Sequence, residues 1–214
     1  MAGVELGFQL DLDIAANASK GGRIGTGVYK VEIIKAYVYK TEKGNNVVDL
    51  ELRSENGEVG FINMLCIDPK WVSGAENFDY PRWQELAASA QMQSLTLVDA
   101  KRVTKDGEVD AKMIKELIGK VINVAVYEEK DVYNNKEKTT LKLSNTFLAD
   151  GRSVAEAQAK KPASRITKIG ERLQPFETKE YKAWKQGGGI STPVETCDPV
   201  EQTVSEEEED DLFG

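Results

Sequence analysis

Two short acidic patterns contain the residue types from which a metal-dependent nuclease could be built. Asp11 and Asp13 are two residues apart near the start of the sequence. Asp49, Glu51 and Arg53 alternate with apolar residues in a later segment. Paired carboxylates can hold the divalent ion that phosphodiester hydrolysis uses, usually beside a lysine that exchanges a proton. Arginine is a poor substitute because its guanidinium stays protonated. We therefore expect Asp49 and Glu51 to be solvated charges on a strand face, with a nuclease as the alternative.

The sequence contains no histidine, which removes several kinds of catalysis. Ser-His-Asp and Cys-His mechanisms and the common histidine-ligated metal sites all need that side chain. The cysteines, Cys66 and Cys197, are far apart in a pattern that is typical neither of a disulfide framework nor of a metal site. We expect a non-catalytic protein that needs no metal and no cofactor.

The glycine-rich stretch Gly21–Lys30 raises the question of phosphate binding. Such loops cradle phosphates when they connect a strand to the N-terminus of a helix. Here the glycines precede a strand pattern, and no Gly-Lys-Ser/Thr motif follows them. We expect a flexible lead into the folded domain, from which Arg23 could approach nucleic acid.

A long strand pattern, Val28–Thr41, is the first element that would position these residues. Its alternation shifts by one residue at Ile33-Ile34, which is typical of a β-bulge and predicts a bent strand. Two further alternating patterns, Val47–Glu55 and Val59–Ile67, follow short turn sequences. The expected result is a meander of three strands.

Two helices are predicted in the middle of the chain. Pro81–Gln93 has proline near its first turn, a position that proline favours. The pattern over Asp106–Gly119 also predicts a helix, with Asp110 as its N-cap and Gly119 just beyond its end.

Strand patterns over Lys120–Glu129 and Lys138–Phe147, joined by a polar loop at Lys130–Glu137, complete the order β-β-β-α-β-β. That order, with a bent first strand, is the connectivity of the OB fold. We expect a mainly β fold, a five-stranded OB-fold barrel with helical insertions, and the alternatives are another small β-barrel or an open α+β sheet. Trp71, Trp83 and Phe78 are expected in the core or in a lid.

Composition divides the chain into a lead segment (1–27), an OB-fold domain (28–150), a helical and basic extension (151–190) and a disordered acidic tail (191–214). The net charge of −8 is concentrated in the tail, which has nine acidic residues and no basic one. The extension has nine Lys and Arg against four Asp and Glu, so this acidic protein still offers a cationic surface. Ser153 and Glu156 form a capping-box pattern there.

Aromatic and basic residues on one face of the expected barrel indicate an oligonucleotide-binding surface. Aromatic rings stack on bases of any sequence and cations follow the phosphates, and OB folds bind oligonucleotides on the outer strand face and two hairpin loops. The candidate DNA-binding residues are Lys35, Tyr37, Tyr39, Lys43, Tyr127, Tyr133, Lys136, Lys138 and Lys142. For each tyrosine the alternative is an ordinary half-buried place in a strand.

The last residues are six consecutive carboxylates, Glu206–Asp211, followed by Leu212, Phe213 and Gly214. A binding domain, a flexible linker and an acidic run that ends near phenylalanine resemble the plan of single-stranded DNA-binding proteins of bacteria and tailed phages. In that family the tip of the tail recruits replication and repair proteins. The resemblance implies that Asp210, Asp211, Leu212 and Phe213 bind partner proteins. The bacterial pattern has proline before a terminal phenylalanine, whereas here leucine precedes Phe213 and glycine follows it.

Together these features predict a protein that binds and protects single-stranded DNA in replication, recombination or repair, encoded by a bacteriophage. No apolar run approaches the roughly 18 residues of a membrane span and no secretory signal pattern is present, so we expect the cytoplasm of a bacterial host. The alternatives are a metal-dependent nuclease or nuclease subunit that uses Asp49 and Glu51, and an acidic adaptor protein. The oligomeric state stays open, a homo-oligomer included.

Overall fold

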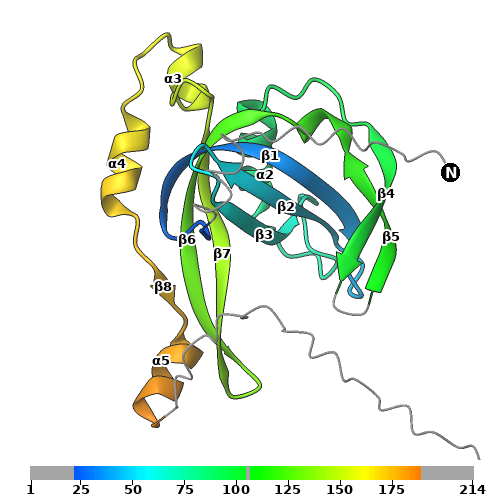
Figure 1. The fold of residues 1–214 in the computed structure, drawn as a ribbon, viewed down its shortest axis with the longest axis vertical. Helices are drawn as coiled ribbons and strands as arrows, with labels where there is room; N and C mark the ends of the chain where they lie inside the picture. Colours follow the sequence, from blue (N-terminus) through cyan, green and yellow to red (C-terminus); the bar gives the residue numbers. More distant parts are fainter. Residues whose placement is uncertain (1–21, 105–106, 189–214) are drawn as a thin grey trace, which may run out of the picture.

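The computed structural model describes residues 22–104 and 107–188 (Figure 1). Several expectations fall outside these residues: the carboxylates Asp11 and Asp13, the thiol of Cys197, and the partner-binding residues Asp210, Asp211, Leu212 and Phe213. Within the described residues, no helix combines the length and the apolar character that a membrane crossing requires.

Strands dominate the described part of the chain, as predicted. They are β1 (Gly27–Lys40), β2 (Asn46–Ser54), β3 (Val59–Cys66), β4 (Leu97–Thr104), β5 (Gly107–Ile114), β6 (Val121–Tyr133), β7 (Lys136–Phe147) and the short β8 (Phe176–Glu177). The helices are α2 (Tyr80–Ser89), α3 (Val154–Gln158), α4 (Arg165–Arg172) and α5 (Lys179–Gln186), with one 3₁₀ turn, η1 (Lys115–Leu117).

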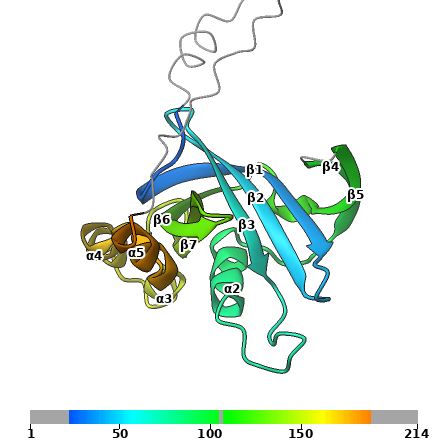
Figure 2. The same ribbon diagram turned by 90° about the horizontal axis from the view of Figure 1, so that it is seen from below.

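Five of these strands pair into a ring in the order β1-β2-β3-β7-β6, and β6 pairs again with β1 (Figures 1 and 2). All neighbours in the ring are antiparallel except β3 and β7, which run parallel and meet only at Ile62 and Leu141. The predicted meander of three strands and the helix after it are confirmed.

The predicted bulge in β1 is confirmed as well. Its pairing with β2 changes register between Ile33 and Lys35, and Ile33 and Ala36 are both fully buried on the inner side. β1 pairs with β6 over its first residues, Gly27–Glu32, and with β2 over Val31–Lys40. Lys35 and Tyr37 consequently face outward.

The core lies inside the ring and is closed on one side by α2. Leu50, Leu52 and Ile122 are among its fully buried side chains, and Trp83 and Leu86 of α2 pack into the same cluster. Figure 2 shows α2 on the opposite side of the ring from β1. The expected burial of Trp83 is confirmed, whereas Phe78, in the loop before α2, is 82% exposed.

The helix predicted over Asp106–Gly119 is wrong, because residues from Gly107 to Ile114 form a strand that pairs with β4. Asp110 is not an N-cap but lies in the middle of β5 opposite Lys101, with 2.5 Å between its Oδ1 and the lysine Nζ. The pairing satisfies the backbone through β4, and of the apolar residues that suggested a helical stripe, Val109 is exposed whereas Ile114 and Leu117 are buried. Only η1 is helical here, and Gly119 follows it with a φ of 75°.

The polar loop predicted at Lys130–Glu137 is also replaced, because β6 and β7 continue to a two-residue turn at Asn134-Asn135. Both asparagines have positive φ, 51° and 59°, as a tight hairpin turn of this kind requires. The hairpin therefore projects well beyond the ring (Figure 1).

The C-terminal extension runs along the outside of β6 (Figure 1). Its capping box is confirmed: the Ser153 hydroxyl accepts from the Glu156 N–H while the Glu156 carboxylate accepts from the Ser153 N–H. The two residues of β8 pair in parallel with β6, and Tyr181 of α5 is buried. The extension is thus docked on the domain through strand pairing and a buried ring.

Candidate nucleic-acid interface

A row of three cross-strand neighbours crosses the outer face of β1, β2 and β3. Lys35 is opposite Glu51, and Glu51 is opposite Phe61. The Lys35 Nζ lies 2.7 Å from the Glu51 Oε2, and the Phe61 side chain is 51% exposed beside them. An ion pair and an open aromatic ring therefore stand next to each other on this face.

Asp49 is the centre of a second row on the same face. It is opposite Tyr37, its Oδ1 accepts from the Met64 N–H at 2.8 Å and from the Tyr39 hydroxyl at 3.2 Å, and Arg102 pairs with its other oxygen. Burial raises the pKa of Tyr39, and the charge of Asp49 raises it further. Tyr39 is thus held neutral as a hydrogen-bond donor to Asp49.

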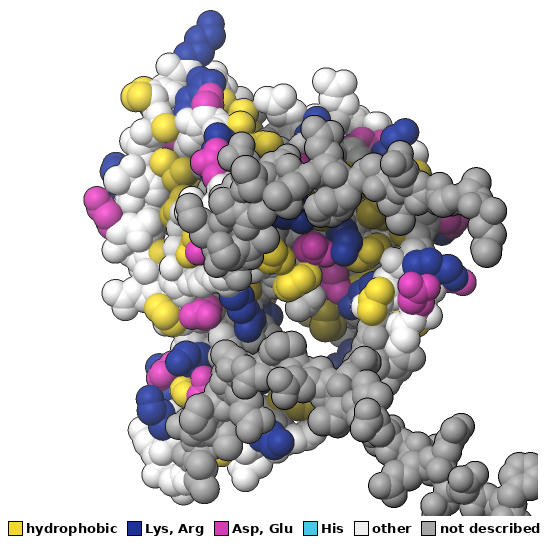
Figure 3. Space-filling view, viewed as in Figure 1, with side chains coloured by type: hydrophobic (Ala, Val, Ile, Leu, Met, Phe, Trp, Pro, Cys, Tyr) yellow, Lys and Arg dark blue, Asp and Glu magenta, His cyan; other side chains and the backbone are white. Residues whose placement is uncertain are grey.

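The two rows line the floor of a hollow of about 380 Å³ between the ring and the β4–β5 hairpin. Its residues are Lys35, Tyr37, Asp49, Leu50, Glu51, Phe61, Asn63, Arg102 and Val103. Figure 3 shows basic, acidic and apolar side chains side by side around the hollows near the middle of the molecule.

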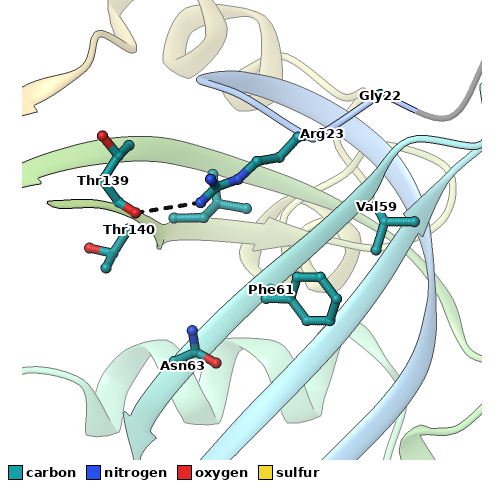
Figure 4. Close-up of a pocket in the computed structure, with 8 residues that line it drawn as sticks. Gly22, Arg23, Val59, Phe61, Asn63, Thr139 and Thr140 are labelled. Carbon is teal, nitrogen blue, oxygen red and sulfur yellow. Dashed lines mark hydrogen bonds between the residues drawn. The ribbon is translucent and has the colours of Figure 1, made fainter. Parts of the chain in front are cut away.

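A neighbouring hollow continues this surface toward β7 (Figure 4). It shares Phe61 and Asn63 with the first and adds Arg23, whose Nη2 lies 3.5 Å from the carbonyl oxygen of Thr139. Figure 4 shows Arg23 reaching toward β7 across the space above Phe61. We call the two hollows together the groove.

The groove ends near the β1–β2 loop on one side. There Lys43 and Tyr39 line a wider hollow of about 860 Å³ together with Met64, Trp71 and Val72. Met64 and Val72 are 55% and 66% exposed, so this end is more apolar than the middle of the groove. Lys43 is exposed at its rim.

The β6–β7 hairpin carries the remaining predicted residues. Tyr127 and Lys142 are cross-strand neighbours that line a small hollow beside Asn63, and Lys142 lies 3.4 Å from Glu129. Farther along, the exposed Tyr133 has the Lys138 Nζ 5.5 Å from its ring centre. Lys136 is exposed at the start of β7, next to the turn.

Helix α5 fixes the end of this hairpin. The Trp184 indole N–H donates to the Asn135 side chain at 2.8 Å, and the Tyr181 hydroxyl donates to Glu137 at 2.8 Å. The C-terminal extension therefore holds the hairpin that carries Tyr133, Lys136 and Lys138.

The structure thus separates the nine predicted residues into four places: Lys35 and Tyr37 in the groove, Tyr39 and Lys43 at its β1–β2 end, Tyr127 and Lys142 beside β3, and Tyr133, Lys136 and Lys138 at the hairpin. Sequence reasoning missed Phe61 and Arg102. Phe61 could have been found, because it shares a strand face with the polar Asn63. Arg102 had no such signal, since β4 was not recognised as a strand.

The carboxylates considered for a nuclease both lie in the groove, but each has a cationic partner. Asp49 pairs with Arg102 and Glu51 pairs with Lys35. Among the residues that the structure describes, no three carboxylate, thiol or imidazole side chains gather as a metal ion would need.

No protein-family model matches the sequence, and no curated protein is significantly similar to it. The chemistry of the groove and the order of the strands are therefore the basis for inferring a function.

Proposed function

We propose that this protein is an OB-fold protein that binds single-stranded DNA and catalyses no reaction. The ring supports the OB assignment because its strand order, with β1 between β2 and β6 and a parallel contact of β3 with β7, is that of a five-stranded Greek-key barrel. Oligonucleotides bind OB folds over the second and third strands, between the first and last hairpin loops.

The observation that carries the proposal is the position of the groove. It crosses the outer face of β2 and β3 and lies between the β1–β2 loop and the β6–β7 hairpin. Phe61, Tyr37 and Tyr133 would offer rings to unpaired bases, and Arg23, Lys43 and Lys136 would follow phosphates. A duplex hides the faces of its bases, so rings in a groove favour a single strand.

The acidic tail would connect DNA binding to replication, recombination and repair by binding partner proteins. On the resemblance to bacterial and phage single-stranded DNA-binding proteins, Leu212 and Phe213 would anchor in an apolar pocket of a replication, recombination or repair protein, with Asp210 and Asp211 against basic residues at its rim. We propose the bacterial cytoplasm, after phage infection, as the place of action. These tail residues lie outside the described residues, so this step depends on the sequence alone.

A salt-titrated binding assay tests the proposal directly. Fluorescence anisotropy with labelled single-stranded DNA, duplex DNA and RNA of equal length should show the tightest binding to single-stranded DNA. Affinity should fall by about 0.7 log units per log unit of salt for each phosphate neutralised. Equal or tighter binding to the duplex would contradict the proposal, and failure to bind any nucleic acid would favour an acidic adaptor protein.

A further inference from the structure

The Lys35–Glu51 pair presents a defined hydrogen-bonding pattern to the groove. The ammonium of Lys35 has three N–H donors, of which the contact with Glu51 uses one, and the carboxylate of Glu51 has acceptor sites on both oxygens. Both side chains line the same hollow. Along the pair, a donor is therefore followed by two acceptors.

Guanine has the complementary order on its Watson–Crick edge. Its O6 accepts a hydrogen bond, and the neighbouring N1–H and the 2-amino group both donate. Thymine has an acceptor, one donor and a second acceptor, so its O2 would face a carboxylate oxygen. Adenine and cytosine each present a single amino group, which could donate a hydrogen bond to Glu51. Proteins that bind single strands read bases on these edges when the bases are splayed out.

Phe61 supplies the second requirement of a base site, which is a surface for stacking. Its ring is half exposed, and it lies directly opposite Glu51 on the neighbouring strand. A base stacked on the outer face of β3 would therefore have its edge close to the Lys35–Glu51 pair. The hollow of about 380 Å³ falls within the roughly 300–1,000 Å³ of typical ligand pockets.

We propose that this part of the groove is a subsite for one guanine base, which stacks on Phe61, donates two hydrogen bonds to Glu51 and accepts one from Lys35. The inference rests on the proposed binding of single-stranded DNA and adds a base preference to it. The rest of the groove still binds by stacking and phosphate contacts, which are tolerant of sequence.

The partial burial of Glu51 strengthens the preference for guanine. The Glu51 side chain is only 19% exposed, so a base that fills the hollow removes most of the remaining water from it. Hydrogen bonds to a charged group count for more where water is excluded, and an unmatched acceptor costs more there as well. The ion pair with Lys35 holds the carboxylate in place before the base arrives.

Base substitution in an otherwise uniform oligonucleotide tests the subsite. Labelled dT12 is compared by fluorescence anisotropy with the same oligonucleotide carrying one central guanine, which is too little guanine for an intramolecular quadruplex. The guanine oligonucleotide should bind about tenfold tighter, the discrimination expected of a well-made bidentate contact. Hypoxanthine, which lacks the 2-amino group, should bind more weakly than guanine. 7-Deazaguanine, which keeps the whole Watson–Crick edge, should bind like guanine.

Two matched variants assign the preference to Glu51. Glu51→Gln keeps the size of the side chain but has one acceptor oxygen and one donor amide, so the guanine and thymine oligonucleotides should bind with equal affinity. Glu55→Gln is the control, because Glu55 also pairs with a lysine of β1, Lys30, at 2.5 Å but does not line the groove. This control should retain the preference.

The outcomes separate this inference from the function on which it rests. If dT12 and the guanine oligonucleotide both bind with equal affinity to the unaltered protein, the subsite is wrong while the single-strand function stands. If neither oligonucleotide binds, both the guanine subsite and the proposed single-strand function are wrong. A guanine preference that persists in Glu51→Gln would also overturn the role of this carboxylate.

Discussion

The guanidinium carbon of Arg102 lies 4.3 Å from the centre of the Tyr39 ring, while the same guanidinium pairs with Asp49. This contact joins β4 to the outer face of β1 and β2. The β4–β5 hairpin also pairs with the ring where Tyr37 and Val38 of β1 meet β5. Arg102 is therefore a second attachment of the hairpin, and it fixes the wall of the groove.

Replacing Arg102 by alanine should destabilise the protein by about 1–3 kcal/mol, because the buried Asp49 side chain would lose a charged hydrogen-bond partner. Arg102→Lys should recover only part of this loss, since lysine lacks the flat guanidinium that stacks on Tyr39. Urea denaturation measures both values. A change within error for Arg102→Ala would show that the hairpin does not depend on this contact.

Phe61→Ala should weaken binding to single-stranded DNA by about 1–3 kcal/mol, the loss expected for one stacked base. Phe176→Ala is the matched control, because both rings are 51% exposed but Phe176 lies on β8, away from the groove. Anisotropy titration at one salt concentration compares the two variants. Equal losses for both, or none for Phe61→Ala, would remove Phe61 from the binding surface.

The parts of the fold that were predictable are those with local signals. The shift at Ile33-Ile34 predicted the bulge that turns Lys35 and Tyr37 toward the groove, and the spacing of Ser153 and Glu156 predicted a capping box. Both depend on residues that are neighbours in sequence. The hairpin turn has a signal too, in Asn134-Asn135, but the polar residues around it favour a loop.

The β4–β5 hairpin could not be predicted in the same way, because its structure depends on pairing between two polar segments. Val109, Met113 and Ile114 have spacings that suit a helix as well as a strand, and the pairing with β4 decides the outcome. The misassigned hairpin also hid Arg102. The groove residues Lys35 and Tyr37 of β1 were therefore among the predicted ones, whereas Phe61 of β3 and Arg102 of the unrecognised β4 were missed.

Glu156 should titrate well below its usual pKa of 4.5, because hydrogen bonds from Ser153, Ser164 and Arg165 to its carboxylate favour the charged form. A carboxylate whose pKa is lower in the folded state than in the unfolded state stabilises the fold at pH above the unfolded-state pKa. This stabilisation is lost as the pH falls through the folded-state pKa. The start of α3 and α4 should therefore loosen only in strong acid.

Amide NMR signals of Ser153, Ser164 and Arg165, followed from neutral to acid pH, measure this titration. They should move together at a pH well below 4.5. In Glu156→Gln the same signals should shift at neutral pH and lose their acid titration. A midpoint at 4.5 or above in the unaltered protein would contradict the network.

Prolonged incubation of the protein with single-stranded DNA and Mg²⁺ or Mn²⁺ should leave the DNA intact. Asp49 accepts hydrogen bonds from the Arg102 guanidinium and the Met64 N–H, and Glu51 pairs with Lys35, so a metal ion would have to displace two cations to reach both carboxylates. Gel electrophoresis of end-labelled DNA is the measurement, with Asp49→Asn as the control. Cleavage that disappears in Asp49→Asn would establish a nuclease and overturn the proposed function.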